Sequence, residues 1–342
     1  MEALSRPAVT LDQVARAAGV SRATASRVFS GSHAVSEEAR RSVDRAAQEL
    51  RYVPNRAAKS LAAGRSESVG VVVPQPTSPH FLDPLFPRLL RAIGEELSAN
   101  GLQMAVFAPQ SDVDVDRLEQ YLAGGHVDAV LMLNLPGFDA LSDRLQARGI
   151  PVVFGGRPQG APVSFVDIDN RGGGRTATEH LVEQGRRLIA HIAGPRQVVA
   201  ASERQQGFHD AMWSAGLRSD LVEQGELDRD GGELAMSRLL AREDQIEAVF
   251  CASDAMAAGA MWAAQVVGRR IPDDIAIMGF DDLPLAAVTR PSLSSVRQPV
   301  ERMGQEMTRM LLDMSAPGVH PPRQVYVGPE LVVRESTARR GC

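Results

Sequence analysis

Residues 10–31, TLDQVARAAGVSRATASRVFSG, predict two short helices joined by a tight turn. Thr10 is a good N-cap, and Gln13 three residues later completes a capping box. Gly19 lies where the first helix must end in a residue that tolerates a positive φ, and Ser21 can cap the second helix. The side chains expected on the outer face of that second helix are Arg22, Ala23, Ser26 and Arg27.

A capped helix, a glycine turn and a second helix with a basic outer face form the helix-turn-helix pattern, whose second helix enters the DNA major groove. We expect Arg22, Ala23 and Arg27 to read base edges, with Arg27 donating two hydrogen bonds to a guanine. The residues expected to hold phosphates are Thr10, Ser21, Thr24, Ser26 and Ser36. A helical hairpin without a DNA partner is the alternative. The two caps, the glycine and the basic face together favour DNA binding.

The distribution of charge supports this interpretation. The net charge of the chain is −5, but the first 65 residues carry 11 Lys or Arg against 6 Asp or Glu. The remainder carries 26 basic against 36 acidic residues. A basic N-terminal region on an acidic body indicates that only the N-terminal region meets a nucleic acid. A third helix, beginning after the N-cap Ser36 and ending near Arg51, would complete its small core.

Length and composition exclude several classes of protein. With 342 residues, 44% hydrophobic and 23% charged, the chain has room for more than one globular domain. The apolar runs are too short to span a bilayer, and the N-terminus lacks the apolar stretch of a signal peptide. The two cysteines, Cys251 and Cys342, suggest neither a disulfide framework nor a zinc site. We therefore expect a cytoplasmic protein with no membrane partner, no metal and no cofactor.

From residue 68 onward, strand and helix patterns alternate. Apolar runs typical of buried parallel strands occur at 69–74, 102–108, 127–134, 150–156, 187–194, 248–253 and 275–280. Helices are expected at 84–99, 113–123, 138–148, after Gly172 to 184, at 202–215, near Glu233, at 254–267 and at 300–314. Two halves of similar length, broken near 167–170, predict two α/β lobes of parallel sheet. Ligands bind such sheets at the carboxyl ends of the strands.

The N-terminal stretch resembles the LacI family of bacterial transcriptional regulators. The family pattern V-T-hydrophobic-x-x-V-A-x-x-A-G-V-S-x-x-T-x-S-R-V is matched from Val9 to Val28, with Ala25 where a valine is common, and the resemblance continues to the C-terminus. It implies a small all-α helix-turn-helix headpiece with a hinge helix, followed by an α/β two-lobed core like that of periplasmic binding proteins.

The resemblance also implies a division into domains. Residues 8–53 would form the DNA-binding domain, 54–66 the hinge helix and linker, and 67–342 the effector-binding and dimerisation core. The chain would cross between lobes near Ile168, Val296 and Tyr326. The first lobe would then comprise about 67–168 and 297–326, and the second about 169–296 and 327–342.

Residues 54–64 form a segment that Pro54 and Gly64 delimit, too short to be a stable helix alone in water. A simple linker is one interpretation. The resemblance favours a hinge helix that folds on the operator, pairs with its dimer mate and inserts a leucine into the minor groove. Such a wedge kinks the duplex. The positions that match this helix are Asn55, Ala58, Lys59 and Leu61.

Candidate ligand residues follow the strand ends. DPLF at 83–86 matches the family's N-P-F-F, so Asp83 and Phe86 are expected to face the ligand, with Phe81 nearby. A carboxylate beside an aromatic face suits a sugar ring. The alternative is a core Phe86 and an N-cap Asp83. Arg157 follows the expected strand at 150–156, although Gly156 stands where the family commonly has an aspartate.

Further candidates lie in the second half of the chain. ASERQQGF matches the family's R-x-x-G-hydrophobic, which makes Arg204 the strongest ligand candidate, since a guanidinium offers a fork of donors to neighbouring oxygens. In CASDAMAAGA, Ser253 is expected to reach the ligand and Asp254 to cap the helix. GFDD places Asp281 on the far wall of the site, and Asp169 and Asn170 are weaker candidates.

Enzyme interpretations have little support. The glycine run 172–174 lacks the G-x-G-x-x-G spacing, and the sequence contains no P-loop, H-E-x-x-H or G-x-S-x-G motif. The sequence therefore predicts a homodimeric repressor of carbohydrate-use genes that binds a pseudo-palindromic double-stranded operator and is controlled by a small carbohydrate between its lobes. A purine or nucleoside effector is the alternative within this architecture. A solute-binding receptor without operator specificity is the alternative outside it.

Overall fold

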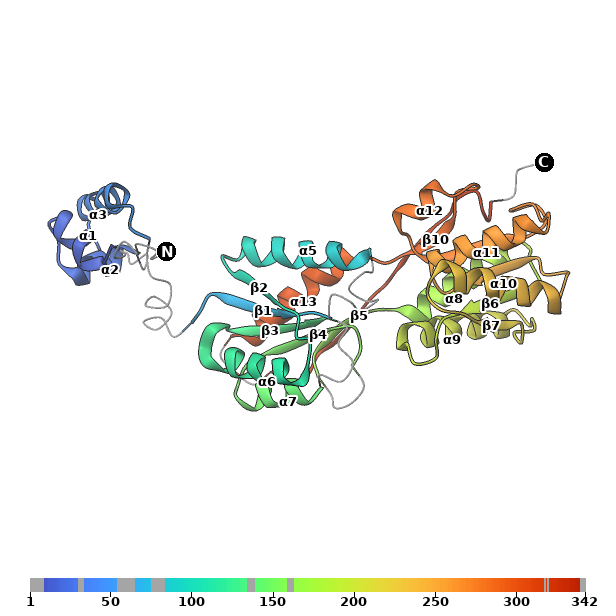
Figure 1. The fold of residues 1–342 in the computed structure, drawn as a ribbon, viewed down its shortest axis with the longest axis horizontal. Coiled ribbons are helices and arrows are strands. Elements are labelled where there is room, and N and C mark those ends of the chain that lie inside the picture. Colours follow the sequence, from blue (N-terminus) through green and yellow to red (C-terminus); the bar gives the residue numbers. More distant parts are fainter. Residues whose placement is uncertain are drawn as a thin grey trace, which may run out of the picture. The chain divides into compact units, whose positions relative to one another are not determined.

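In the computed structural model, the described residues are 9–29, 34–53, 65–74, 84–133, 139–158, 163–316, 318 and 320–338 (Figure 1). The chain divides into two compact units, Met1–Ser68 with Gly124–Asp128, and Val69–Ala123 with Ala129–Cys342. None of the helices in the described ranges is long and apolar enough to cross a membrane.

Three helices, which we call the headpiece, form the described part of the N-terminal region. They are α1 (Leu11–Ala17), α2 (Arg22–Phe29) and α3 (Glu37–Leu50). The predicted capping box of Thr10 and Gln13 is present, and Gly19 has a φ of +67°. Val14, Ala25 and Val43, one from each helix, are buried in a common core. The predicted helices of this region are confirmed. They could be predicted because local caps and the spacing of apolar residues determine where they form.

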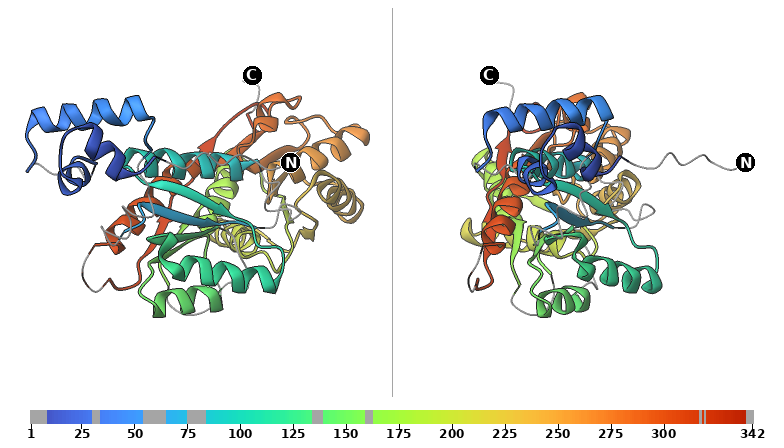
Figure 2. Two further views of the ribbon diagram at one scale, coloured as in Figure 1. Left: turned by 60° about the vertical axis from the view of Figure 1, so that its left-hand side comes forward. Right: turned by 90° about the vertical axis from the view of Figure 1, so that its left-hand side faces the viewer.

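The first lobe is built on a six-stranded sheet in the order β11-β5-β4-β3-β1-β2. Its strands are β1 (Ser68–Val72), β2 (Gln103–Phe107), β3 (Ala129–Leu133), β4 (Val152–Gly155), β5 (Phe165–Ile168) and β11 (Gln324–Val327). Helices α5 (Leu85–Ala99) and α13 (Val300–Met314) lie on one face, and α6 (Asp112–Tyr121) and α7 (Asp139–Ala147) on the other (Figures 1 and 2). Met303, Met307 and Met310 of α13 pack into the core with α5.

The second lobe has the sheet order β12-β10-β9-β8-β6-β7. Its strands are β6 (Ile189–Ala193), β7 (Val222–Gln224), β8 (Ala248–Cys251), β9 (Ala276–Asp281), β10 (Ser294–Arg297) and β12 (Glu330–Val332). Its helices are α8 (Asn170–Glu183), α9 (Val199–Ser214), α10 (Arg229–Arg242), α11 (Asp254–Val266) and α12 (Pro284–Val288). The strands are parallel except that β12 runs antiparallel to β10.

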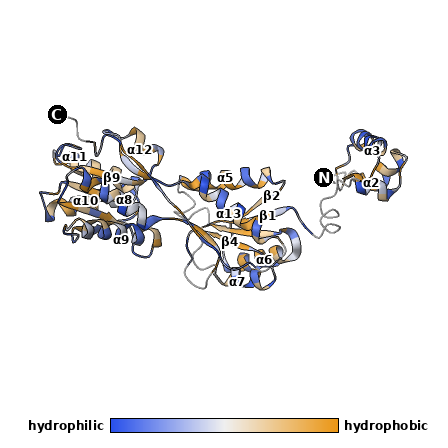
Figure 3. Ribbon diagram, turned by 180° about the vertical axis from the view of Figure 1, so that it is seen from behind, coloured by the Kyte–Doolittle hydropathy of each residue, from blue (hydrophilic) through white to orange (hydrophobic). Residues whose placement is uncertain are grey.

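Alternation along the strands of the second lobe explains why helices cover both faces. Val249 and Cys251 pack with α10 and α11, whereas Ala248 and Phe250 pack with α8 and α9. Strands such as β1, β4 and β9 are mostly hydrophobic, and the surrounding helices carry the hydrophilic residues (Figure 3). A strand buried on both faces must be apolar throughout, which is why these strands read as continuous runs in the sequence.

Three connections join the two lobes. β5 leads into α8, β10 leads into α13, and β11 leads into β12. The second connection consists of Gln298 and Pro299, and the third of Gly328 and Pro329. Strands β5, β10, β11 and β12 were expected only as crossing segments, and their strand conformation depends on partners far away in the sequence, such as Ser295 opposite Val332.

Two expected helix starts are wrong. α8 begins at Asn170, not after Gly172, because Asp169 caps it by accepting a hydrogen bond from the Gly172 amide at 2.8 Å. The glycine run therefore lies inside the helix. A Cβ atom at Gly174 would overlap the carbonyl oxygen of Arg204 on α9, so this glycine allows the two helix backbones to approach closely. α9 begins at Val199 rather than near residue 202.

Candidate nucleic-acid interface and effector site

The outer face of α2 carries the predicted base-reading residues. Ser21 caps the helix, its Oγ accepting from the Thr24 amide at 3.0 Å. Arg22, Ala23, Ser26 and Arg27 are exposed, and Thr24 is half-buried. Arg22 also lies 3.5 Å from the Asp12 carboxylate of α1. The face has the composition that DNA contact requires, and the DNA roles of its residues stay predictions.

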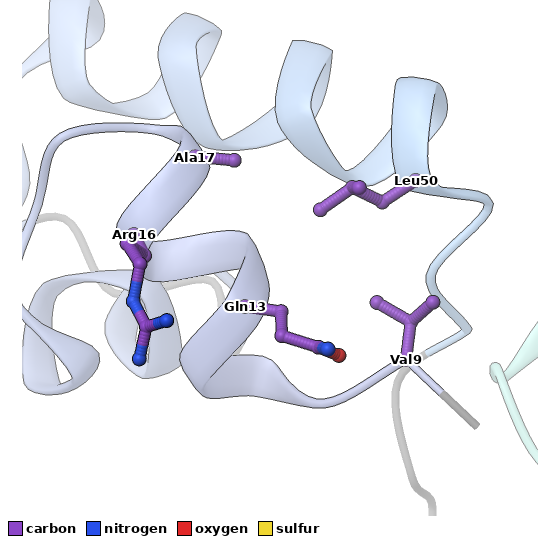
Figure 4. A pocket seen from close by; sticks show the side chains of 5 residues that line it. All are labelled: Val9, Gln13, Arg16, Ala17 and Leu50. Atoms are coloured by element: carbon purple, nitrogen blue, oxygen red, sulfur yellow. The ribbon is translucent and has the colours of Figure 1, made fainter. Parts of the chain in front are cut away.

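The predicted phosphate contacts Thr10 and Ser36 are N-caps. Their hydroxyl oxygens accept from the amides of Gln13, at 3.4 Å, and Ala39, at 3.3 Å. The positive end of a helix dipole favours a phosphate at such a position. A separate cavity of about 280 Å³ in the headpiece is lined by Val9, Gln13, Arg16, Ala17 and Leu50 (Figure 4). None of its lining residues is a predicted DNA contact, so it is distinct from the predicted interface.

Several predicted site residues lie outside the described residues. They are the hinge positions Asn55, Ala58, Lys59 and Leu61 and the ligand candidates Phe81 and Asp83. The remaining candidates of the core are all described.

Arg204 of α9 is the centre of a buried polar cluster. Its Nε donates to Asn170 Oδ1 at 2.9 Å, and its Nη1 donates to the carbonyl oxygen of Ala252 at 2.6 Å. The same Nη1 lies 3.3 Å from Asp281 Oδ1, and the guanidinium carbon lies 3.7 Å from the centre of the Phe280 ring. The structure thus brings three predicted residues together, from α8, α9 and the end of β9.

The cluster extends to the connection between β10 and α13. Gln298 donates from Nε2 to Asp281 Oδ1 at 2.5 Å. We call Arg204, Asn170, Asp281 and Gln298 the Arg204 network. It joins the start of α8, which follows the first connection, to the second connection. Sequence reasoning missed Gln298, whose only signal is its position beside the predicted crossing near Val296.

The backbone is strained where β9 ends. Asp281 and Asp282 have φ values of 107° and 53°, a region that disfavours residues with a Cβ atom. Each such conformation costs about 1–3 kcal/mol and persists only when its surroundings hold it, which is common at ligand sites. The strained backbone coincides with the predicted ligand residue Asp281, whose role stays a prediction.

A second group of charges connects the lobes through side chains. Arg157, after β4, donates to Glu203 on α9 at 3.2 Å. Burial raises the pKa of Glu203, and it raises the pKa of Asp167 on β5 to about 6, with a smaller contribution from the nearby Glu203. Gly156, where the family commonly has an aspartate, donates its amide to the carbonyl oxygen of Val166 on the adjacent strand β5. The next residue of β5, Asp167, therefore places a carboxylate close to position 156. Sequence reasoning missed both carboxylates.

The other ligand candidates have structural partners. Phe86 is buried in the first lobe's core, as the alternative interpretation expected, and Asp169 caps α8. The prediction that Asp254 caps α11 is wrong, because Ser253 is the N-cap and accepts from the Met256 amide at 3.2 Å. Asp254 instead accepts from the Leu283 amide at 2.7 Å and from Ser295 Oγ at 2.6 Å.

The pKa of Asp254 is raised to about 8 by burial first and by the nearby Asp281 carboxylate second. A protonated Asp254 at neutral pH leaves the charge of the site to Asp281 and Arg204. Among the described residues, no group of histidine, cysteine or carboxylate side chains could hold a metal ion.

Comparison with known proteins supports the same architecture. Residues 10–55 match the family described as bacterial regulatory proteins, lacI family, and residues 178–337 match a periplasmic binding protein-like domain. The HTH-type transcriptional regulator CelR of Thermobifida fusca is 44% identical over 98% of this chain and 100% of its own length. The chain belongs to the LacI family. The predicted class of transcriptional regulator and the predicted fold class are thereby confirmed.

Other members of the LacI family are more distant. The ribose operon repressor of Halalkalibacterium halodurans is 34% identical over 96% of this chain and 97% of its own length. The PurR repressor of Erwinia tasmaniensis is 33% identical over the same shares. These relatives are all transcriptional regulators.

Solved structures of LacI-family proteins resemble this one over nearly the whole chain. The CelR–cellobiose complex has 43% sequence identity and a TM-score of 0.72, and the match covers 97% of this chain and 100% of the CelR chain. The lac repressor dimer bound to operator and the anti-inducer ONPF has 27% sequence identity and a TM-score of 0.82. That match covers 96% of this chain and 99% of the lac repressor chain.

Proposed function

We propose that this LacI-family regulator represses genes by binding a pseudo-palindromic operator as a homodimer, and that a cellobiose-like sugar between its lobes controls the affinity. Residues 8–53 would bind DNA, 54–66 would form the hinge, and 67–342 would sense the effector and dimerise. The protein would act in the cytoplasm, where the operator is, and without catalysis.

The observation that carries this proposal is the full-length identity to CelR, since a solved relative of the same length and architecture is a complex with cellobiose. The chemistry of the Arg204 network supports it. A guanidinium and a carboxylate 3.3 Å apart offer donors and acceptors to the vicinal hydroxyls of a sugar. The proposed contacts are Phe81, Asp83, Arg157, Asp169, Asn170, Arg204, Ser253 and Asp281, with Phe86 packing behind them.

Coupling to DNA would run through the connections between the lobes. A sugar bound to residues from both lobes would favour one angle between them, and the first lobe carries the linker to the headpiece. An effector shifts such an equilibrium only by binding one state more tightly than the other. The hinge positions Asn55, Ala58, Lys59 and Leu61 would then pair and insert into the minor groove in one state only.

A purine effector is the second candidate, because the PurR repressors are also similar over most of the chain. Their identity of 33% is lower than the 44% of CelR. We therefore propose the sugar first.

The test begins with full-length protein and random DNA duplexes at physiological salt. We expect selection of an inverted repeat, and release of that duplex by cellobiose but not by ribose or hypoxanthine. Release by hypoxanthine alone would favour the purine candidate. No preference for any inverted repeat would refute the proposed repressor.

Arg27→Ala tests the base-reading face. This variant should lose the sequence preference, by roughly 1–3 kcal/mol at one base pair, while cellobiose binding persists. Arg45→Ala is the matched control, because Arg45 is also an exposed arginine of the headpiece, on α3, and is not a predicted DNA contact. It should leave the sequence preference unchanged. An unaltered preference in Arg27→Ala would remove that residue from base reading.

A further inference from the structure

Asp282, the residue after the strained end of β9, holds two arginines with one carboxylate. Arg297 Nε donates to Oδ2 at 2.7 Å, and Arg334 Nη2 lies 2.7 Å from Oδ1. The Asp282 side chain is only 6% exposed, so solvent screens these ion pairs weakly. We call Asp282, Arg297 and Arg334 the Asp282 clamp.

Both arginines lie in the second lobe. Arg297 is the last residue of β10, just before the second connection, and its Nη1 lies 3.6 Å from the Glu330 carboxylate at the start of β12, directly after the third connection. Arg334 lies two residues beyond β12 and holds Asp282 from the other side. Asp281, Arg297 and Glu330 are aligned in one row across β9, β10 and β12. The clamp therefore fastens both C-terminal connections to the end of a strand that stays within the second lobe.

The clamp is next to the Arg204 network but separate from it. Asp281 points its carboxylate at Arg204 and Gln298, whereas Asp282 points its own at Arg297 and Arg334. The Asp282 amide also donates to Ser295 Oγ at 3.0 Å, which anchors the left-handed backbone to β10. Asp281 of the Arg204 network and Asp282 of the clamp are therefore joined by a single peptide unit.

We infer that Asp282 is a positioning residue that fixes the angle between the lobes by tying their second and third connections to the effector-side end of β9. It does not contact the effector. The inference rests on the proposed function for its regulatory meaning, whereas the fixed angle itself does not depend on any ligand. Without the clamp, the two connections move independently of Asp281.

The test measures the distance between the lobes in solution. Spin labels are placed on Asp116→Cys of α6 and Ser237→Cys of α10, both exposed. The background is Cys342→Ser, since Cys251 is buried, and labelled chains are diluted with unlabelled chains. Pulsed electron resonance then gives the distance distribution. Asp282→Asn should at least double its width, with and without cellobiose.

Asp274→Asn is the matched control, because Asp274 forms an exposed ion pair with Arg270 in the same lobe and contacts neither connection. It should leave the width unchanged. Of the two ion pairs of Asp282, Arg297→Gln removes only the one with Arg297, and it should also broaden the distance distribution. This variant serves as the test if Asp282→Asn fails to fold. Unchanged widths in the folded variants would overturn the inference.

Measurements of cellobiose binding and of duplex release distinguish a failure of this inference from a failure of the proposed function. If wild type binds cellobiose and releases its selected duplex, Asp282→Asn should bind cellobiose within about threefold but release the duplex at least tenfold less effectively. If wild type does not bind cellobiose, the proposed effector fails, and the distance measurement still decides the clamp.

Discussion

Arg204 is a buried side chain that connects three elements of the second lobe. It donates hydrogen bonds to Asn170 of α8 and to the carbonyl oxygen of Ala252 after β8, forms an ion pair with Asp281 at the end of β9, and stacks on Phe280. A guanidinium so placed is pre-organised, because its donors are fixed before a ligand arrives. The residue was predicted from its motif, but its partners Asn170 and Asp281 come together only through the fold.

Arg204→Met should abolish the response to effector and leave the preference for the selected duplex intact. The change leaves Asn170 and Asp281 without their buried partner, so we also expect a loss of roughly 1–3 kcal/mol in the free energy of unfolding. Urea denaturation and effector titration measure the two effects. Arg238→Met, which removes a half-exposed pair with Glu223, is the control and should change neither. A retained response would exclude Arg204 from the effector site.

Asp254 makes stability depend on pH. Its pKa rises from 3.8 to about 8 in the folded chain, so between these values the folded state holds a proton that the unfolded state has released. Its contribution is complete below pH 3.8 and is lost as the pH rises through 8. Asp254→Asn should therefore gain stability relative to wild type from pH 5 to 8, by at most about 1.4 kcal/mol per pH unit.

Urea denaturation of both proteins at each pH checks this prediction. Asp274→Asn is the control, because the Arg270 guanidinium lowers the pKa of that exposed carboxyl. A difference between Asp254→Asn and wild type that stays constant over the range would contradict it.

At the scale of elements, the contact between α8 and α9 depends on glycine. A Cβ atom at Gly174 would overlap the backbone of Arg204, and a Cβ atom at Gly207 would overlap the backbone of Arg171. Close contact of the two helices places Arg204 beside Asn170, so the packing of helices sets the geometry of the Arg204 network. The glycine run is therefore a packing device rather than a nucleotide-binding loop.

Gly174→Ala should lower the free energy of unfolding by roughly 1–3 kcal/mol, because its Cβ would overlap the Arg204 carbonyl oxygen and the helices must separate. Thermal melting measures the loss. Gly94→Ala on α5 is the control, since its Cβ would meet the Met104 side chain at an ordinary 3.4 Å. It should be neutral or stabilising, because alanine favours a helix. Equal melting temperatures for wild type and Gly174→Ala would refute this role.

Elements governed by local signals were predicted well. The headpiece helices and most strands of the two sheets follow from caps, glycine turns and continuous apolar runs. Strands β5, β7, β10, β11 and β12 were not predicted as strands. The pairing of β10 with β12, for example, joins residues that are far apart in the sequence. The wrong choice of Asp254 instead of Ser253 as the N-cap of α11 has the same origin. Both residues are good caps, and only the distant Ser295 and Leu283 decide which of them turns into the core.

At the scale of the whole molecule, the second lobe has an exposed apolar patch. We use this name for five exposed apolar side chains, Leu234 on α10, Trp262 and Val266 on α11, Val267 directly after α11 and Val288 at the end of α12. Helix α11 contacts both α10 and α12. Patches of this kind mark interaction sites. A second copy of the chain is the occupant that the proposed homodimer requires.

Trp262→Glu should convert the dimer to a monomer and weaken binding to an inverted repeat at least tenfold, because each monomer reads one half-site. Light scattering and duplex titration measure both effects. Trp213→Glu is the control, since Trp213 is 86% exposed at the end of α9, outside the patch. A Trp262→Glu protein that stays dimeric would place the interface elsewhere.

The three connections between the lobes have a consequence for synthesis. β11, the edge strand of the first sheet, pairs with β5 but is encoded about 150 residues later, and α13 of that lobe is also late. Domains fold as units while the ribosome extends the chain. The first lobe cannot complete its sheet until almost the entire message is translated, and the second lobe gains β12 only a few residues later. Truncation near the 3′ end of the gene would leave both sheets unfinished.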